Sequence, residues 1–254
     1  MEIGSVGIIG AGLMGSGIAE VCARNGIRTL VTEAGPEQLA AGQQRVNASL
    51  ERGRQTGKLS PEDLDRISGL LTFTPRLEDF AECDFCVEAI VEQLPAKVTL
   101  FEQLDRIVSA DAILATNTSA LPIIEIARAT RRPDRVIGTH FFNPAPVMKL
   151  IEVVRSIATS DETLEDTRAL GERLGKRIIV AQDRGGFIVN LLLDSVSHPR
   201  DPALRVRLRD PRGHRRRDAS RLRSSHGTAA AARLHRPRHR AVRVRVAVRG
   251  VRQQ

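Results

Sequence analysis

The sequence predicts an α/β protein built on a mostly parallel, doubly wound sheet. Two observations predict this class. Strand-like and helix-like segments alternate from the N-terminus to about residue 182, as they do when helices connect parallel strands. The first strand also runs into a G-x-G-x-x-G turn at Gly10, Gly12 and Gly15 that opens a helix, an arrangement typical of dinucleotide-binding units in such sheets.

The segments follow one another in a regular order. An apolar run at 6–9 predicts the first strand, and apolar residues at helical spacing then continue until Gly26 ends the helix. Further apolar runs predict strands at 28–33, 70–74, 83–90, 112–117, 135–142, 147–154 and 176–182. Helical periodicity predicts helices at 36–54, 61–70, 95–109, 121–127 and 161–175.

The glycine-rich turn predicts an NAD site of the Rossmann type. Gly10 and Gly12 let the backbone turn sharply and approach a pyrophosphate, and Gly15 lets the helix pack on the strand. Glu33 ends the second strand 23 residues after Gly10, where its carboxylate can bind both ribose hydroxyls and repel a 2′-phosphate, which favours NAD over NADP. The alternative is a turn that binds nothing. The cofactor-binding residues predicted in the turn are Gly10, Gly12, Leu13, Met14 and Gly15.

Composition separates two parts of the chain. Residues 1–198 contain 21 Lys and Arg against 27 Asp and Glu, a net charge of −6, whereas residues 199–254 contain 18 Arg and three Asp, a net charge of +15. There is no apolar run of the roughly 20 residues that span a bilayer, and the N-terminus lacks a signal-type segment, so we expect a cytoplasmic protein without a membrane partner. Cys83 and Cys86 form a C-x-x-C pair, but no second pair follows, and we expect buried core residues rather than a redox or zinc site.

Polar side chains at two strand ends indicate chemistry. Ser119 follows the strand at 112–117, and ligands bind at the carboxyl ends of strands in open α/β sheets. His140 is the only histidine in the first 197 residues and lies near the end of the next predicted strand. If the segments around His140 and Glu152 pair like a hairpin, the carboxylate can hold the imidazole as a general base. A core histidine with a satisfied hydrogen bond is the alternative.

Five sequence blocks resemble the 3-hydroxyacyl-CoA dehydrogenase family, particularly its short bacterial 3-hydroxybutyryl-CoA dehydrogenases, over residues 3–193. The blocks are GIIGAGLMGSGIAE, VEAIVEQLPAK, NTSALPI, GTHFFNPAPVMKLIEV and GFIVN. The resemblance implies oxidation of a 3-hydroxyacyl-CoA to the 3-oxoacyl-CoA with NAD, or the reverse reduction, in fatty-acid or butanoate metabolism.

The resemblance also implies roles for individual residues. His140 would be the general base and Glu152 its orienting partner, while Ser119 and Asn190 would bind the reacting oxygens of the substrate. Contacts to the nicotinamide half of NAD would come from Glu92, Lys97 and Asn143, and contacts to the CoA phosphates from Arg52, Arg54 and Lys58. No metal is implied. For the three basic residues a solvated helix face is nearly as good an explanation.

The resemblance ends before the chain does. Residues 183–186 read DRGG where the family usually has Asp, a small residue, Pro and Gly, and Leu191 replaces an arginine. We therefore predict an NAD-binding domain at 1–184, the start of the family's helical domain at 185–193, and an irregular Arg-rich tail at 194–254 in place of the rest. This tail has too few apolar residues to form a core, so it is disordered or an out-of-frame translation. Codons compatible with residues 194 onward, read one base out of frame, can encode segments resembling the missing helical domain.

Two other function classes follow from the same features. The Arg-rich tail could bind nucleic acid through phosphates, but it has no aromatic residues to stack on bases. The chain could also be an inactive NAD-binding remnant, although the four residues with catalytic roles in the resemblance are all present. The family would form homodimers through the helical domain that is missing here.

Overall fold

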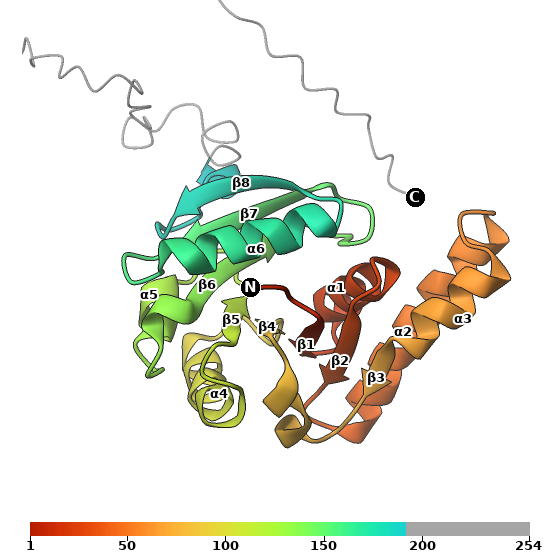
Figure 1. Cartoon of the computed structure of the whole chain (residues 1–254), viewed down its shortest axis with the longest axis horizontal. Coiled ribbons are helices and arrows are strands. Elements are labelled where there is room, and N and C mark those ends of the chain that lie inside the picture. Colours follow the sequence, from red (N-terminus) through yellow and green to blue (C-terminus); the bar gives the residue numbers. More distant parts are fainter. Residues whose placement is uncertain (192–254) are drawn as a thin grey trace, which may run out of the picture. The chain divides into compact units, whose positions relative to one another are not determined.

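The computed structural model describes residues 1–191, which lie in one compact unit of the chain. An eight-stranded sheet has the order β3-β2-β1-β4-β5-β6-β7-β8 (Figure 1). Its strands are β1 Ser5–Ile9, β2 Arg28–Thr32, β3 Leu71–Phe73, β4 Phe85–Glu88, β5 Ile113–Thr116, β6 Val136–Phe141, β7 Leu150–Arg155 and β8 Arg177–Gln182. Every neighbouring pair is parallel except β6 and β7, which are antiparallel. The mostly parallel α/β class is confirmed.

The direction of winding changes between β1 and β4. From β1 the chain moves outward through β2 to β3, then returns to β4 on the other side of β1 and continues to β8. Helices that follow β1 and β4 therefore leave the sheet in opposite directions, and a crevice opens between them at the carboxyl edge of the strands. This edge is where the sequence predicts the site.

Helices cover both faces of the sheet. They are α1 Leu13–Arg24, α2 Pro36–Gln55, α3 Pro61–Gly69, α4 Leu94–Ile107, α5 Ile123–Ala127 and α6 Asp161–Arg173, with 3₁₀ turns at Leu77–Glu82 and Pro133–Arg135. Apolar residues of α1 and α6 pack on one face, and those of α4 and α5 pack on the other. Successive strand residues such as Ile8 and Ile9 belong to different cores, because side chains alternate across a strand.

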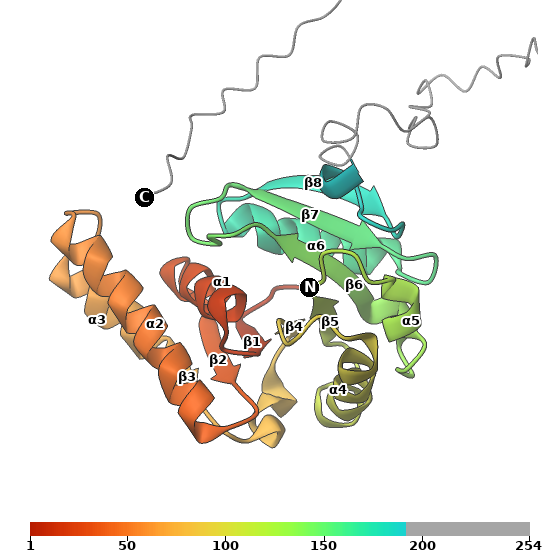
Figure 2. The ribbon, with the colours of Figure 1, turned by 180° about the vertical axis from the view of Figure 1, so that it is seen from behind.

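The α2–α3 hairpin forms a smaller core with the end of α1. Ala23, Val46, Leu50 and Ile67 are buried there together. The hairpin lies at the β3 side of the sheet, away from β6, β7 and β8, in both views (Figures 1 and 2). The turn between α2 and α3, with residues 56–60, is therefore separated from the strands that carry His140 and Glu152.

Predicted and observed elements differ mainly at strand ends. Strand β7 begins at Leu150 rather than at 147, because the backbone N–H groups of Val147 and Met148 both donate to the Pro144 carbonyl at 3.0 Å and form a turn. Strands β4 and β5 are shorter than predicted, since each pairs only where its neighbours are extended. The two 3₁₀ turns were not predicted. The tail predicted at 194–254 lies outside the described residues.

Candidate active site

The glycine-rich turn lies at the switch point of the sheet. Gly10 has φ +104°, and a Cβ there would approach the Ala89 carbonyl oxygen to 2.5 Å. A Cβ on Gly15 would approach the Gly10 carbonyl oxygen to 1.7 Å, so the helix can pack this closely on the turn only without a side chain. A Cβ on Gly12 would meet nothing within 4 Å. The turn is thus fixed by its first and third glycines and open at its second.

Glu33 is held directly against this turn. Its Oε2 accepts the Ala11 N–H at 2.8 Å, and its Oε1 accepts the Ala34 N–H at 2.9 Å. The carboxylate therefore bridges the end of β2 and the start of α1, where an adenosine ribose would be bound. Of the two remaining predicted residues, Leu13 is 67% exposed beside the turn, while Met14 packs against the core below it.

His140 and Glu152 face each other across the antiparallel strands. The β6–β7 register pairs these two residues, and His140 Nδ1 lies 2.7 Å from Glu152 Oε2. An ionised carboxylate can only accept, so a neutral imidazole in this contact would have its proton on Nδ1 and its lone pair on Nε2. Glu152 is 0% exposed and His140 8%, and the ring of Phe142 lies 4.5 Å from the imidazole. The pair can hold and transfer a proton in an environment with little water.

The second oxygen of Glu152 binds the segment after β8. Oε1 accepts the backbone N–H groups of Ile188 at 3.0 Å and Val189 at 2.9 Å. The next residue, Asn190, donates from Nδ2 to the Ser119 carbonyl oxygen at 3.1 Å. One carboxylate thereby positions the imidazole and the backbone that carries Asn190, and the Asn190 side chain extends these contacts to Ser119.

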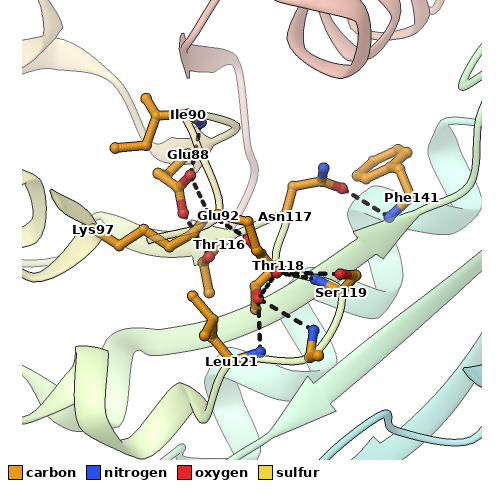
Figure 3. Close-up of polar contacts among 11 residues, drawn as sticks. Glu88, Ile90, Glu92, Lys97, Thr116, Asn117, Thr118, Ser119, Leu121 and Phe141 are labelled. Atoms are coloured by element: carbon orange, nitrogen blue, oxygen red, sulfur yellow. Dashed lines mark hydrogen bonds and ion pairs between the residues drawn. The ribbon is translucent and has the colours of Figure 1, made fainter. Parts of the chain in front are cut away.

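Ser119 is held by Glu92 (Figure 3). The Oε1 atom of Glu92 accepts the backbone N–H of Ser119 at 2.8 Å, its hydroxyl at 3.2 Å, and the hydroxyl of Thr118 at 2.5 Å. Lys97 Nζ lies 3.1 Å from Glu92 Oε2. Burial works to raise the pKa of Glu92, but the hydrogen bonds from Thr118 and Ser119 and the charge of Lys97 outweigh it and lower that pKa.

Lys97 is buried beside Glu92, and its predicted contact to NAD stays a prediction. Its side chain is 1% exposed and ends between the carboxylates of Glu88 and Glu92. It therefore faces the protein interior and Glu92, rather than an open ligand surface. Glu88 was not predicted as a site residue, although an acid inside the apolar run FCVEAI is the signal that could have identified it.

Two further residues that were not predicted from the sequence bind backbone N–H groups near the site. The Asn117 Oδ1 atom accepts the Phe141 N–H at 2.9 Å, next to His140. Both carboxylate oxygens of Asp183 accept backbone N–H groups at the start of α5, from Ile123 at 2.9 Å and Ile124 at 2.8 Å. Polar residues directly after strands β5 and β8 were the available signal.

Other predicted residues lie apart from this cluster. Asn143 is exposed in the β6–β7 loop. Arg52, Arg54 and Lys58 are exposed at the end of α2 and in the turn after it, and Arg54 pairs with Glu51 at 2.6 Å. Among residues 1–191, no hydrogen bond or ion pair joins these four side chains to His140. Their roles toward NAD and CoA stay predictions.

The cysteines form part of the core, as predicted. Cys22, Cys83 and Cys86 are all free and buried, and burial raises the pKa of the Cys22 thiol to about 12. Within residues 1–191 no group of three metal-ligating side chains comes together. In the same part of the chain no helix is both long enough and apolar enough to cross a membrane.

Most of the chain is similar in sequence to known proteins. Residues 5–184 match the family model of the NAD-binding domain of 3-hydroxyacyl-CoA dehydrogenase. The 3-hydroxybutyryl-CoA dehydrogenase of Mycobacterium tuberculosis (strain CDC 1551 / Oshkosh) is 46% identical over 190 residues, which are 74% of this chain and 66% of that protein. A probable 3-hydroxybutyryl-CoA dehydrogenase of Bacillus subtilis (strain 168) is 44% identical over 193 residues, 76% of this chain and 67% of that protein.

A solved structure extends the similarity to the fold. The crystal structure of (S)-3-hydroxybutyryl-CoA dehydrogenase from Ralstonia eutropha superposes with a TM-score of 0.76 at 37% identity, covering 78% of this chain and 70% of that chain. The chain spans about two thirds of the length of the relatives it matches.

Proposed function

The chain belongs to the 3-hydroxyacyl-CoA dehydrogenase family, and we propose that it interconverts (S)-3-hydroxybutyryl-CoA and acetoacetyl-CoA with NAD(H). Residues 5–184 correspond to the family's NAD-binding domain, so NAD is the cofactor. Two relatives at 44–46% identity carry the name 3-hydroxybutyryl-CoA dehydrogenase, which supports this acyl-CoA as the substrate. The reaction belongs to fatty-acid or butanoate metabolism, and we expect it to take place in the cytoplasm.

The residues of the glycine-rich turn suit a dinucleotide. The open space at Gly12 and the free N–H groups at the start of α1 would receive the pyrophosphate, and Glu33 would bind the ribose hydroxyls. Bound NAD supplies the acceptor for the hydride that leaves C3 of the substrate. Every other requirement of the reaction falls to side chains of the protein.

The central requirement is removal of the C3 hydroxyl proton. We assign it to Nε2 of His140, because Glu152 holds the shared proton on Nδ1 and leaves Nε2 free to accept. As the imidazole becomes positive, the carboxylate of Glu152 stabilises it. The 2.7 Å contact between Nδ1 and Oε2 is the observation that carries this proposal.

Ser119 and Asn190 would bind the reacting oxygen. Both residues lie at the carboxyl edge of the sheet and contact each other. The second amide hydrogen of Asn190 can donate to an oxygen that gains negative charge as its proton leaves, and the Ser119 hydroxyl can do so once it turns from Glu92 to the substrate.

Turnover of acetoacetyl-CoA tests the proposal. Purified chain should oxidise NADH only when acetoacetyl-CoA is present, and His140→Ala should reduce that rate to background while leaving NADH affinity within about twofold. NADH oxidation at an equal rate in the two proteins would overturn the proposal and favour a chain that only binds NAD.

The reading frame after residue 193 is a separate proposal. We infer that residues 194–254 are translated one base out of frame. The family resemblance stops there, and codons compatible with these residues, read in the shifted frame, can encode segments that resemble the family's helical domain. A chain lacking that domain should bind NADH but turn over slowly and fail to form the family's homodimer. Sequencing the coding DNA decides it, since stop codons directly after the shift would eliminate the idea. Restoring the frame should raise the rate.

Nucleic-acid binding by the Arg-rich segment is the competing explanation of its charge. Binding through phosphates alone should weaken steeply with salt and show no sequence preference. Sequence-selective binding that persists at high salt would favour a biological role for the segment.

A further inference from the structure

A fully buried carboxylate lies beneath the candidate active site. Glu88 ends β4 at the switch point, beside Ile9 of β1 and Thr116 of β5. It is 0% exposed, as is Lys97, and their Oε1 and Nζ atoms lie 2.6 Å apart. Burying two charges is costly unless each is paired and hydrogen-bonded, so this pair requires an explanation.

Both carboxylate oxygens of Glu88 accept hydrogen bonds from neighbouring residues. Its Oε1 also accepts the Ile90 N–H at 2.7 Å, and its Oε2 accepts the Thr116 hydroxyl at 2.6 Å. Three elements thus hold the carboxylate in one orientation: the β4–α4 connection, helix α4 and strand β5. A group held this rigidly can act as a fixed reference for residues bound to it.

Lys97 connects Glu88 to the site. Its ammonium group lies between Glu88 and Glu92 (Figure 3). Of these two acids, Glu88 is 0% exposed and Glu92 is 40% exposed. The other oxygen of Glu92 accepts both the N–H and the hydroxyl of Ser119. A continuous chain of contacts therefore runs from Glu88 through Lys97 and Glu92 to Ser119.

The charges explain why Glu88 is needed. With Glu88 present, the ammonium of Lys97 is shared between two carboxylates, and Glu92 retains one oxygen for Ser119. Without the charge of Glu88, Lys97 would be an under-compensated buried cation. It would draw Glu92 inward, and Oε1 would leave Ser119.

We propose that Glu88 is a positioning residue that fixes Ser119 through Lys97 and Glu92. Glu88 is fully buried, so in this proposal it acts through other residues. The importance of Ser119 for turnover rests on the proposed function, whereas the positioning itself is a property of the folded protein without ligands. The two can therefore fail separately.

The resonance of the Ser119 amide tests the positioning directly. Its proton donates to a carboxylate, so ¹H–¹⁵N spectra and amide exchange report that contact without substrate. Glu92→Gln should shift the resonance and accelerate exchange by roughly tenfold, the effect of weakening one charged hydrogen bond. Glu88→Gln should shift the Ser119 amide resonance in the same direction. The double variant should shift the resonance no more than Glu92→Gln alone does.

Asp105 provides the matched control. It is a buried acid on α4, near the end of that helix opposite Lys97, and pairs with Arg131 and Arg132. Asp105→Asn should lower stability yet leave the Ser119 amide unchanged. If Glu88→Gln leaves that amide unchanged, or if its effect adds fully to that of Glu92→Gln, Glu88 does not act through Glu92 and the proposal is wrong.

A milder variant covers the case in which Glu88→Gln does not fold. Thr116→Val removes one hydrogen bond to Glu88 and keeps its charge. It should move the Ser119 amide resonance in the same direction by a smaller amount. An unmoved resonance in folded Thr116→Val would also overturn the proposal.

Discussion

Glu152 lies directly opposite His140 in the antiparallel strands β6 and β7, with its Oε2 2.7 Å from the imidazole Nδ1. The antiparallel pairing is the exception in this sheet, and it is what places an acid beside a base twelve residues away in the sequence. Oε1 of the same carboxylate accepts the N–H groups of Ile188 and Val189. Replacing either oxygen by a hydrogen-bond donor would therefore remove an acceptor that the site uses.

Glu152→Gln should reverse the tautomer of His140. The two backbone N–H groups require an acceptor, so the amide oxygen should face them and the NH₂ should face Nδ1. Nδ1 must then accept, and the imidazole proton moves to Nε2. The ¹⁵N spectrum should show the Nε2–H form, and turnover should fall by about 10²–10⁴.

Glu172→Gln is the control for this variant, because Glu172 is an exposed acid on α6. It should leave both the ¹⁵N spectrum and the rate unchanged. An Nδ1–H imidazole in Glu152→Gln would contradict the orienting role of Glu152.

Alanine at two glycines of the turn should affect different properties: Gly15→Ala should lower stability, and Gly12→Ala should weaken NADH binding. Gly15→Ala places a Cβ 1.7 Å from the Gly10 carbonyl oxygen and should lower the free energy of unfolding by about 3 kcal/mol or more. Gly12→Ala meets nothing in the protein, so stability should change by less than about 0.5 kcal/mol.

NADH affinity of Gly12→Ala should nevertheless fall, on the order of tenfold or about 1.4 kcal/mol, because its Cβ occupies the space proposed for the pyrophosphate. Urea unfolding and NADH fluorescence measure the two effects. Normal NADH binding by Gly12→Ala would mean that the dinucleotide does not approach the turn there.

Glu33→Ala should reduce the preference for NADH over NADPH. The carboxylate that the Ala11 N–H holds in place would no longer bind ribose hydroxyls or repel a 2′-phosphate, so the dissociation constant for NADH should rise by roughly tenfold. Glu37→Ala, an exposed acid in the first turn of α2, should leave both affinities unchanged. Equal loss of affinity in the two variants would exclude a specific role for Glu33.

The lowered pKa of Glu92 predicts how acid affects stability. Its partners favour the charged form in the folded chain, so the pKa lies below its ordinary value of 4.5. The stabilisation is fully present above that value and is lost as the pH falls through the lower folded pKa. The difference in unfolding free energy between the chain and Glu92→Gln should therefore be constant near neutrality and shrink in acid. A difference that grows in acid would mean that the pKa is raised.

The sequence was sufficient to predict the sheet and the contact between His140 and Glu152, while the catalytic roles stay predictions. Apolar runs and helical spacing record which side chains are buried, and burial on both faces is what a parallel sheet imposes on its strands. The pairing of His140 with Glu152 was predictable because prolines between the two runs indicate a turn. Strand ends were less predictable, since the start of β7 depends on hydrogen bonds to Pro144.

The contacts beneath the site were not predictable. Glu88 appears in the sequence as one acid in an apolar run, and its partner Lys97 appears as part of a helix surface. That the two are buried together depends on how α4 packs over β4, which no local pattern specifies. Asp183 binds the start of α5 some sixty residues earlier in the chain, and only the order of the strands brings those segments together.

The rate of NADH oxidation in a single turnover tests the central claim most directly. With protein in excess over NADH, even a slow reaction of acetoacetyl-CoA can be followed, so the chain can be compared with its His140→Ala variant at saturating ligands. We expect His140→Ala to bind NADH normally and to react about 10²–10⁴ times more slowly. An unchanged rate in that variant would contradict a proton transfer through His140.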